Sequence, residues 1–442
     1  MSGLTDTIFA RASGAGQAAV AVLRLSGPAS AAVLRAIAGA LPPPRLASLR
    51  RLRDPRSAEV LDHALVLWFP GPASYTGEDS AELHLHGGSA VQAAVGEALM
   101  ALGCRPAEAG EFTRRAFLHG RMDLTQAEAV ADLIAAETTA QRRQALRQAD
   151  GALGTLYAGW AQRLTRILAQ QEAAIEFEMD DLPTDVADRA REAAANLQAE
   201  ITAHLDDGGR GEKLREGVSI VILGAPNAGK SSLLNALAGR DAAIVSPQPG
   251  TTRDIVECRL ELAGVPVVLA DTAGLRITTD PIEQEGMRRA SQRGREADII
   301  LAAFAADQDP DAETLAAIAH TDSCILIATK CDLGPPPAIP GAADLLPTSI
   351  RGGPGIERLR AALAEAVARK AGLGEAPALT RARHRAGLAE AATQLDTARQ
   401  ARLPELAAEG YRAALGALGR VTGRVGVEQV LDAVFRDFCI GK

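Results

Sequence analysis

The stretch GAPNAGKSS, residues 224–232, follows the apolar run Val218–Leu223 and precedes the helix-forming run LLNALAGR. It matches the phosphate-loop pattern G-x-x-x-x-G-K-[ST], between the strand and the helix that such a loop requires. Glycines let backbone N–H groups curl around phosphate oxygens, and the N-terminus of the following helix adds partial positive charge. Lys230 can reach the β- and γ-phosphates, and the Ser231 hydroxyl can ligate Mg²⁺. The stretch predicts a nucleotide-binding α/β domain.

Two later motifs indicate that the base is guanine. TKCD, residues 329–332, follows the apolar strand Cys324–Ala328. The Asp332 carboxylate can accept two hydrogen bonds, from N1–H and the exocyclic amine of guanine, whereas adenine offers no such pair. Thr329 stands where this motif usually has asparagine, and Ser349 in PTSIRGG takes the place of the last guanine-contacting loop. We therefore expect a GTP-binding domain.

A third motif concerns hydrolysis. DTAG, residues 271–274, follows a hairpin predicted over residues 257–270. Asp271 ends a buried strand, where a carboxylate on the Mg²⁺ side belongs, and the Gly274 N–H can meet a γ-phosphate. The next residue, where Ras-like proteins have a water-orienting glutamine, is Leu275. Because leucine cannot polarise water, hydrolysis must use another group.

Oxygen-bearing side chains and turns surround the phosphate loop. GTTRD, residues 250–254, supplies Thr252 to close on Mg²⁺, while Asn227 and the run SPQPG, residues 246–250, add amide and carbonyl oxygens. Such oxygens can hold a monovalent cation beside the β–γ bridge, where an arginine finger acts in other GTPases. The alternative is that Asn227 only caps the loop, and the spacing leaves both possibilities open.

Length, charge and cysteine use narrow the class of protein. The 442 residues suffice for two to four domains, and 47% hydrophobic with 23% charged residues is typical of soluble globular proteins. Because the formal net charge is −8, a local patch or a partner must hold most of any bound RNA. The five cysteines lack C-x-x-C spacing, the N-terminus resembles no secretory signal, and no apolar run is long enough for a bilayer. We expect a cytoplasmic protein without membrane contact.

The sequence changes character along its length. Residues 1–120 alternate strand-like runs with turns, whereas residues 121–212 are rich in Ala, Glu, Gln and Arg. The nucleotide-binding motifs fall within residues 213–375, and helix-type sequence returns over residues 376–442. The predicted fold is multidomain: an N-terminal α+β domain, an all-α helical domain in two segments, and a Ras-like P-loop GTPase domain inserted between them.

Two features lie outside the GTPase motifs. His84 and His86 alternate on a predicted strand, but a metal site needs further ligands and none is suitably spaced, so polar residues in or beside a pocket are favoured. The chain ends in FCIGK, residues 438–442, which is no prenylation box. A cysteine near a C-terminus is usually inert surface, yet an unstructured end carrying a thiol and a lysine would suit delivery into a site.

Several blocks distributed over the whole chain belong together. They are DTIFA (6–10), LRLSGP (23–28), SYTGEDSAELHLHGG (74–88), GEFTRRAFLHGRMDLTQAEAVADLI (110–134), GAPNAGKSSLLNALAGRDAAIVS (224–246), PGTTRD (249–254), DTAGLR (271–276) and FCIGK (438–442). With these blocks the chain resembles the MnmE (TrmE) family of tRNA-modification GTPases from end to end. The GTPase motifs occur in many families, whereas the N-terminal blocks together with FCIGK are specific to this one.

The resemblance implies a function that the motifs alone do not. It implies an N-terminal domain of the folate-binding aminomethyltransferase type, which forms a homodimer, and a potassium-dependent GTPase whose domains dimerise during hydrolysis. Together with the FAD-binding partner MnmG (GidA), which holds most of the tRNA, the family installs an aminomethyl-type group on C5 of the wobble uridine of certain tRNAs. The implied one-carbon donor is 5-formyltetrahydrofolate or a related tetrahydrofolate.

The resemblance also assigns residues to sites. The folate site would use Arg24, Glu82, Arg121 and Lys442, with Arg121 standing where many members have lysine. Potassium would be held by Asn227, Ser246, Gln248 and Thr251, and Mg²⁺ by Ser231 and Thr252. The full set expected to bind nucleotide is Asn227, Ala228, Gly229, Lys230, Ser231, Ser232, Ser246, Pro247, Gln248, Pro249, Gly250, Thr251, Thr252, Asp271, Thr272, Ala273, Gly274, Thr329, Lys330, Asp332, Ser349, Ile350 and Arg351.

The catalytic residues implied in the same way are Glu283, Arg253 and Cys439. Glu283, in DPIEQEG, would orient the attacking water in place of the missing glutamine. Its alternative is a solvated carboxylate at a helix start, which spacing alone favours. The role of the Cys439 thiol stays open.

Two other functions compete with this one. A ribosome-assembly GTPase would share the phosphate loop but usually adds a basic RNA-binding domain, which the sequence lacks. A folate-dependent aminomethyltransferase with a vestigial GTPase is the second alternative, and the intact GTPase motifs argue against it. GTP-dependent binding to ribosomal subunits would favour the former, and group transfer without nucleotide or partner the latter.

Overall fold

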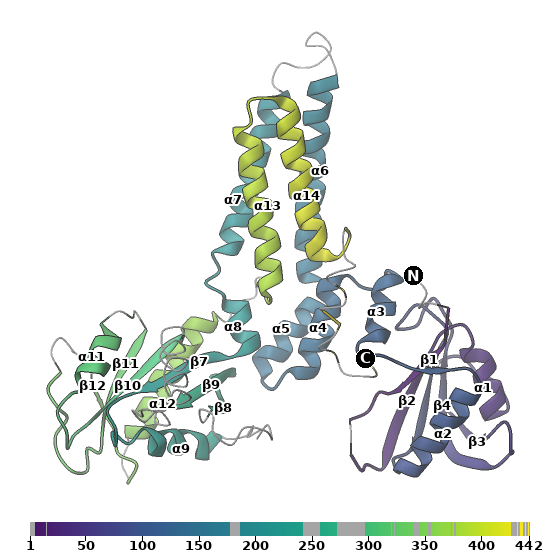
Figure 1. The fold of residues 1–442 in the computed structure, drawn as a ribbon, viewed down its shortest axis with the longest axis horizontal. Helices are drawn as coiled ribbons and strands as arrows, with labels where there is room; N and C mark the ends of the chain where they lie inside the picture. The colour runs from purple at the N-terminus through teal and green to yellow at the C-terminus, as the bar shows by residue number, and fades with distance from the viewer. Residues whose placement is uncertain are drawn as a thin grey trace, which may run out of the picture. The chain divides into compact units, whose positions relative to one another are not determined.

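The chain forms two compact units, each with one six-stranded sheet (Figure 1). The first unit combines residues 1–131, 149–161 and 415–442, and the second combines residues 132–148 and 162–414. The domain boundaries predicted above stay predictions. In this computed structural model the described residues are 5–14, 16–176, 186–241, 257–271, 297–319, 321, 323–339, 345–351, 355–372, 374, 377–425, 431, 434–435, 438 and 441.

The first sheet has the strand order β3-β4-β5-β2-β1-β6. Its strands are β1 (Ile8–Arg11), β2 (Val20–Ser26), β3 (Ser48–Arg53), β4 (Val60–Phe69), β5 (Ser80–His86) and β6 (Arg105–Pro106). The strands pair antiparallel except that β6 runs parallel to β1. Along β4 the side chains alternate, so that Val66 and Trp68 are buried while Leu65 is exposed. The helices α1 (Ser30–Ala38) and α2 (Ser89–Ala101) contact the sheet (Figure 1). Along β3 and β4, exposed side chains alternate with buried ones.

A further group of helices lies outside the two sheets. They are α3 (Glu111–Leu118), α4 (Leu124–Ala135), α5 (Thr139–Ala149), α6 (Ala152–Glu176), α7 (Val186–Leu205), α13 (Ala382–Gln400) and α14 (Pro404–Thr422). In the second unit α13 packs along α7, burying Leu197 and Ile201 against residues such as Leu388, although the second sheet separates these helices in the sequence. Among the described residues, no helix has the length and apolar character needed to cross a bilayer.

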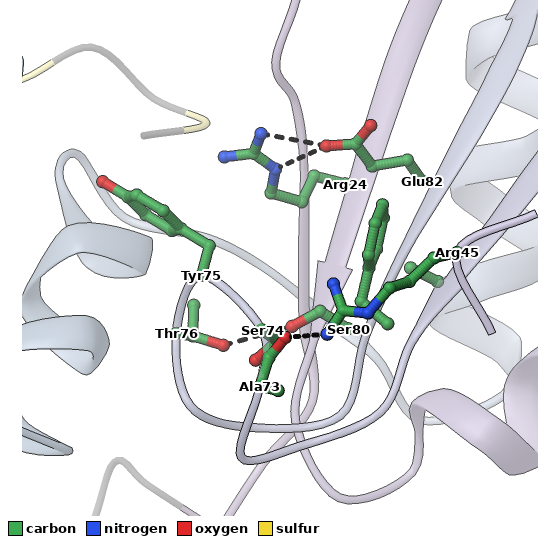
Figure 2. A pocket seen from close by; sticks show the side chains of 10 residues that line it. Arg24, Arg45, Ala73, Ser74, Tyr75, Thr76, Ser80 and Glu82 are labelled. Carbon is green, nitrogen blue, oxygen red and sulfur yellow. Dashed lines mark hydrogen bonds and ion pairs between the residues drawn. The ribbon is translucent and has the colours of Figure 1, made fainter. Parts of the chain in front are cut away.

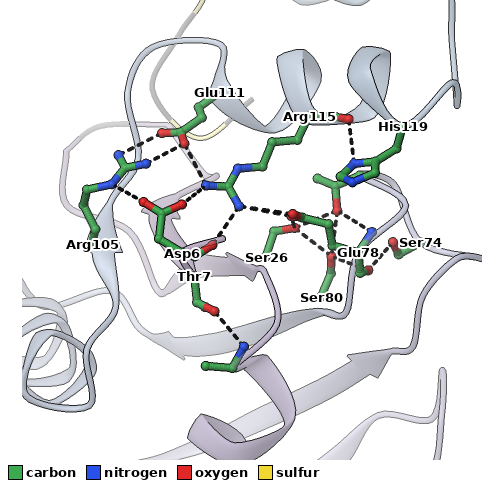
Figure 3. A network of polar contacts seen from close by, with 12 residues as sticks. Asp6, Thr7, Ser26, Ser74, Glu78, Ser80, Arg105, Glu111, Arg115 and His119 are labelled. Carbon is green, nitrogen blue, oxygen red and sulfur yellow. Dashed lines mark hydrogen bonds and ion pairs between the residues drawn. The ribbon is translucent and has the colours of Figure 1, made fainter. Parts of the chain in front are cut away.

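A buried ion-pair network joins α3 to the first sheet (Figure 3). The Arg115 guanidinium is 1% exposed and donates to Asp6 at 2.6 Å and Glu111 at 2.9 Å, and it pairs with Glu78 at 3.2 Å. Arg105 also donates to both Asp6 and Glu111. Burial alone would lower the pKa of Arg115, but the three carboxylates outweigh it and raise that pKa. The charged network therefore fixes the loop that carries Glu78.

The residues just before the C-terminus pack within the first unit. Phe435 and Phe438 belong to an apolar cluster with Leu124 at the start of α4. Gly441 lies so close to the Arg11 carbonyl oxygen of β1 that a Cβ there would meet it at 2.1 Å, and its φ of 103° also excludes most other residues. The end of the chain thus reaches a strand of the N-terminal sheet.

The second sheet has the order β12-β11-β10-β7-β9-β8. Its strands are β7 (Val218–Leu223), β8 (Glu257–Leu262), β9 (Val265–Asp271), β10 (Ile299–Ala305), β11 (Cys324–Thr329) and β12 (Leu345–Pro347). All neighbours are parallel except the hairpin β8–β9. Ala263 and Gly264 both have positive φ, as a tight hairpin turn requires. The strands and the hairpin predicted here are confirmed.

Helices accompany the second sheet, and polar side chains connect it to the rest of the second unit. The helices are α8 (Arg210–Glu216), α9 (Lys230–Asp241), α11 (Ala312–Ile318) and α12 (Gly355–Ala371). Asp132 accepts hydrogen bonds from Arg215 of α8 at 2.9 Å and from Arg381 at 2.7 Å. Gln141 and Gln144 of α5 donate to backbone carbonyl oxygens of α8. Polar contacts therefore hold both chain connections of the second sheet within the second unit.

Candidate functional site

The phosphate loop lies between β7 and α9. Gly224 has a φ of 157°, and a Cβ there would meet the Ala303 carbonyl oxygen of β10 at 2.4 Å, so only glycine allows this approach. Asn227 and Gly229 also have positive φ, and asparagine tolerates that conformation better than most residues. The loop turns back on itself and ends where α9 begins at Lys230, which places a helix N-terminus beneath it.

The Lys230 ammonium lies over the loop. Its Nζ donates to the Gly224 carbonyl oxygen at 2.7 Å and to the Ala225 carbonyl oxygen at 2.8 Å. The residue is 6% exposed, so the cation is held in place within the fold. This arrangement provides a positioned positive charge beside the loop N–H groups, as phosphate binding requires.

Thr329, predicted from the TKCD motif, braces the phosphate loop. Its Oγ1 donates to the Ala228 carbonyl oxygen at 2.6 Å, and both residues are buried. The hydroxyl therefore satisfies a carbonyl of the loop, which explains why a short polar side chain suffices at the position usually taken by asparagine. The sequence placed Thr329 at the nucleotide, and the fold shows that its side chain acts through the loop.

Replacing Thr329 with valine should weaken both the fold and nucleotide binding. Valine has a similar shape but leaves the Ala228 carbonyl buried without its donor, which costs about 1–3 kcal/mol. We expect a lower melting temperature and GTP affinity reduced about tenfold. Thr329→Ser, which keeps the hydroxyl, serves as the control. Parent-like melting and affinity in the valine variant would show that the hydrogen bond is dispensable.

The residues predicted to recognise the base come together at the ends of β11 and β12. Ser349 Oγ donates to Asp332 Oδ1 at 2.7 Å, and the Arg351 N–H donates to Ser349 Oγ at 3.2 Å. The hydrogen bond from Ser349 lowers the pKa of Asp332, so the exposed carboxylate is ionised at neutral pH. Lys330, with a φ of 56°, extends to Asp307 at 2.9 Å. The exposed Asp332 carboxylate can therefore accept hydrogen bonds from the edge of a base.

Several predicted residues lie outside the described part of the chain. The side chain of Asp271 is not described, although its place at the end of β9 is. The others are Ser246, Pro247, Gln248, Pro249, Gly250, Thr251, Thr252, Arg253, Thr272, Ala273, Gly274, Glu283, Cys439 and Lys442. Their roles stay predictions. Among the described residues, no group of three or more His, Cys, Asp or Glu side chains is arranged to hold a metal ion.

A second candidate site is a cavity of about 210 Å³ in the first unit (Figure 2). The residues lining it are Arg24, Arg45, Phe69, Ala73, Ser74, Tyr75, Thr76, Ser80, Ala81 and Glu82. Arg24 and Glu82 face each other across β2 and β5, and the guanidinium donates to Glu82 Oε1 at 2.9 and 3.2 Å. The Arg24 guanidinium also lies 5.4 Å from the Tyr75 ring centroid. The cavity thus combines an aromatic wall with a fixed ion pair.

Hydrogen bonds hold the aromatic wall of this cavity. The Tyr75 hydroxyl lies 2.8 Å from Thr113 Oγ1 on α3, and burial raises the pKa of Tyr75. Ser26, Thr76 and Ser80 form a buried hydroxyl cluster behind the loop. The sequence identified Arg24 and Glu82 but not Tyr75, which lies in the quoted block SYTGEDS, or Arg45, for which it carried no signal.

The remaining N-terminal predictions lie near this cavity or beyond it. Arg121 is exposed and passes beside Gly77, where a Cβ would lie 3.4 Å from the Arg121 Cγ. Its side chain makes no hydrogen bond or ion pair within the described ranges. His84 contacts Glu82 Oε2 at 3.3 Å, and His86 pairs with Asp62 at 2.6 Å. The structure therefore brings Arg24, Glu82 and His84 together and leaves Arg121 at the neighbouring loop.

The comparisons with known proteins indicate the same family along nearly the whole chain. The family model described as MnmE helical domain matches residues 124–439, and the model described as GTP-binding protein TrmE N-terminus matches residues 7–121. A relative from Gluconacetobacter diazotrophicus, named tRNA modification GTPase MnmE, is 57% identical over 438 residues and covers 98% of each chain. A relative of the same name from Granulibacter bethesdensis is 56% identical over 442 residues, covering 99% of each.

Two solved structures resemble part of the chain. The G domain of the FeoB iron transporter from T. maritima is 25% identical with a TM-score of 0.25, covering 35% of this chain and 98% of that one. Era from Aquifex aeolicus is 22% identical with a TM-score of 0.28, covering 42% of this chain and 69% of its own. The family models and the full-length relatives decide the assignment. The chain belongs to the MnmE/TrmE family, whose curated members are named tRNA modification GTPases.

Proposed function

We propose that this chain is a potassium-dependent GTPase that acts in the cytoplasm on the modification of tRNA. The observation that carries the GTPase part is the loop geometry: Lys230 is held over Gly224 and Ala225, and Thr329 at the end of β11 donates to the loop. Asp332, ionised and held by Ser349, supplies the acceptor for guanine. Ser231 and Thr252 would hold Mg²⁺. Asn227, with Ser246, Gln248 and Thr251, would hold potassium.

The N-terminal cavity would bind a tetrahydrofolate. Its residues fit such a group, because Tyr75 and Phe69 offer aromatic surface to a fused ring and Glu82 offers an acceptor for ring N–H and amine donors. Arg24 pairs with that carboxylate and fixes its orientation. When bound, 5-formyltetrahydrofolate or a related derivative would supply a one-carbon unit at the oxidation level of formic acid or formaldehyde. Arg121 and the C-terminal Lys442 complete the proposed site.

The chain would work with partners. By resemblance we propose a homodimer formed through the N-terminal domain, and an FAD-containing partner, MnmG, which holds most of the tRNA. The product would be an aminomethyl-type group on C5 of the wobble uridine. Names of the relatives that cover nearly the whole chain support tRNA modification over ribosome assembly.

Mass spectrometry of wobble nucleosides tests this proposal directly. In cells that lack this protein, the C5 substituent should disappear from the affected tRNAs, and expression of the parent chain should restore it. An unchanged nucleoside profile in the deletion strain would refute the role in tRNA modification. Expression of the Lys230→Ala variant as a control shows whether the nucleotide site is needed for restoration.

Hydrolysis should depend on the identity of the monovalent cation. If oxygens around Asn227 position potassium beside the β–γ bridge, GTP hydrolysis should be about a hundredfold faster in potassium than in sodium, because the smaller ion fits the loop poorly. Asn227→Ala should remove the difference. Phosphate release at matched ionic strength measures it. Equal rates in both salts, with a normal alanine variant, would remove the cation from the mechanism.

Asp332→Asn should exchange guanine preference for xanthine. Asparagine replaces one acceptor by a donor, so GTP should bind about a hundredfold more weakly while xanthosine triphosphate gains what GTP loses. Asp309→Asn, an equal change of charge at an exposed position outside the motif, should bind GTP like the parent. Titration with fluorescent nucleotides measures both affinities. A parent protein that binds ATP as tightly as GTP would contradict the guanine assignment.

A further inference from the structure

Arginines gather at one end of the first sheet. Residues 45–56 carry five arginines and one acid, Asp54, in a chain whose formal net charge is −8. β3, which contains three of these arginines, is the edge strand of the sheet. We call Arg45, Arg50, Arg51 and Arg53 the arginine edge. Positive charge is therefore concentrated at an edge of the sheet, although the net charge of the whole protein is negative.

Within the described residues, no carboxylate forms an ion pair with a member of the arginine edge. Three of its members donate to backbone carbonyl oxygens, which carry no net charge. The fourth, Arg51, is exposed, and its side chain forms no hydrogen bond or ion pair in the part of the chain that the structure describes. Asp54 pairs with Arg56, outside the edge, at 3.0 Å. Arg50 is half-buried with its Nε enclosed, so the exposed guanidinium groups of Arg45, Arg51 and Arg53 are the ones that remain for an external anion.

The spacing of the exposed groups suits a phosphate backbone. Arg51 and Arg53 are both exposed and two residues apart on one strand, which separates them by about 7 Å. Successive phosphates along an RNA strand are separated by a similar distance, and a guanidinium can bind a phosphate through two parallel hydrogen bonds. Arg51 and Arg53 can therefore each bind one of two successive phosphates.

Apolar and imidazole side chains accompany the arginines. Leu49 and Leu65 lie opposite each other across β3 and β4 and are 66% and 45% exposed. Arg51 lies opposite His63, which is also exposed. Unpaired bases of RNA loops contact such apolar, imidazole and guanidinium surfaces, while their phosphates require cations. The combination matches a single-stranded RNA loop better than a purely ionic partner.

The arginine edge also continues into the cavity. Arg45 lines the cavity that contains Arg24 and Glu82, and its guanidinium donates to the Ala73 carbonyl oxygen at the rim (Figure 2). We propose that the arginine edge binds the phosphates of a single-stranded RNA loop at the rim of this cavity. The inference rests on the proposed function and adds to it a surface of this chain that contacts the RNA itself.

Charge reversal tests the surface. The double variant Arg51→Glu/Arg53→Glu should bind an unmodified anticodon stem-loop RNA, with uridine at the wobble position, about tenfold more weakly. Because two phosphate contacts are lost, the slope of log K against log salt concentration should fall by about 1.5. The matched control is Arg166→Glu/Arg402→Glu, which changes net charge equally at exposed arginines of the helical segments. Its slope should equal that of the parent. Fluorescence anisotropy with the full chain measures both.

The outcomes separate this inference from the proposed function. Equal weakening in both double variants, or parent-like binding by the first, would refute the RNA surface even if the parent chain restores wobble modification in a deletion strain. A deletion strain with normal wobble nucleosides would refute the proposed function instead. Parent-like RNA binding combined with a changed oligomeric state, or with loss of a protein partner, would assign the edge to protein contact and also refute the inference. Unchanged GTP hydrolysis in the first variant shows that it folds.

Discussion

Replacing Lys230 with alanine is expected to abolish GTP hydrolysis, with a loss of at least about a hundredfold in affinity for GTP. The ammonium is held within hydrogen-bonding distance of two loop carbonyl oxygens and is nearly buried, so its removal takes away a positioned positive charge beside the loop. Charged contacts to phosphate are among the strongest hydrogen bonds that proteins make. Titration with a fluorescent GTP analogue and phosphate release measure the two losses.

Thermal unfolding separates loss of binding from loss of fold. In the parent, GTP should raise the melting temperature, since a ligand that binds only the native state stabilises it. Lys230→Ala should melt near the parent temperature without nucleotide and should no longer respond to GTP. Lys370→Ala, at the end of α12, is the control and should respond normally. A Lys230 variant that still gains stability from GTP would contradict the assigned role.

Glu283→Ala should lower kcat for GTP hydrolysis by about two to three orders of magnitude while leaving GTP affinity nearly unchanged. The reason lies in the sequence: Leu275 occupies the position of the water-orienting glutamine, and Glu283 is the acid that the family resemblance assigns to the second switch region. A group that orients water acts in the transition state and contributes little to binding of the ground state. Single-turnover hydrolysis with saturating GTP measures kcat directly.

Glu283→Gln distinguishes charge from position. If the carboxylate must accept a hydrogen bond from the attacking water, glutamine should recover only part of the rate. Glutamine keeps one acceptor oxygen but replaces the other with a donor. Glu285→Ala, two residues away, is the matched control and should hydrolyse GTP like the parent. Modification of tRNA should fall together with hydrolysis if turnover drives the cycle. Hydrolysis within about twofold of the parent in Glu283→Ala would show a solvated surface carboxylate instead.

The nucleotide site was largely predictable because its signals are local. The phosphate loop needs glycine at positions of unusual φ, a lysine and a hydroxyl at fixed offsets, and a strand and helix on either side, all within residues 218–241. The hairpin β8–β9 is equally local, since Ala263 and Gly264 set the turn and the apolar runs set the strands. Asp332 and Ser349, though separated along the chain, each follow a recognisable strand of a parallel sheet whose strand ends meet on one side.

Only the tertiary structure decided the contacts between distant segments. The bond from Thr329 to Ala228 spans 101 residues and depends on β10 separating β7 from β11, which no local pattern states. Arg24 meets Glu82 because β2 and β5 pair in one register, and a shift by one residue would turn either side chain to the other face. The arginine edge likewise required knowing that β3 is outermost in its sheet. The sequence by itself determined each motif and the conformation it needs, while strand order and register decided which motifs meet, because those are settled by burial across the whole chain.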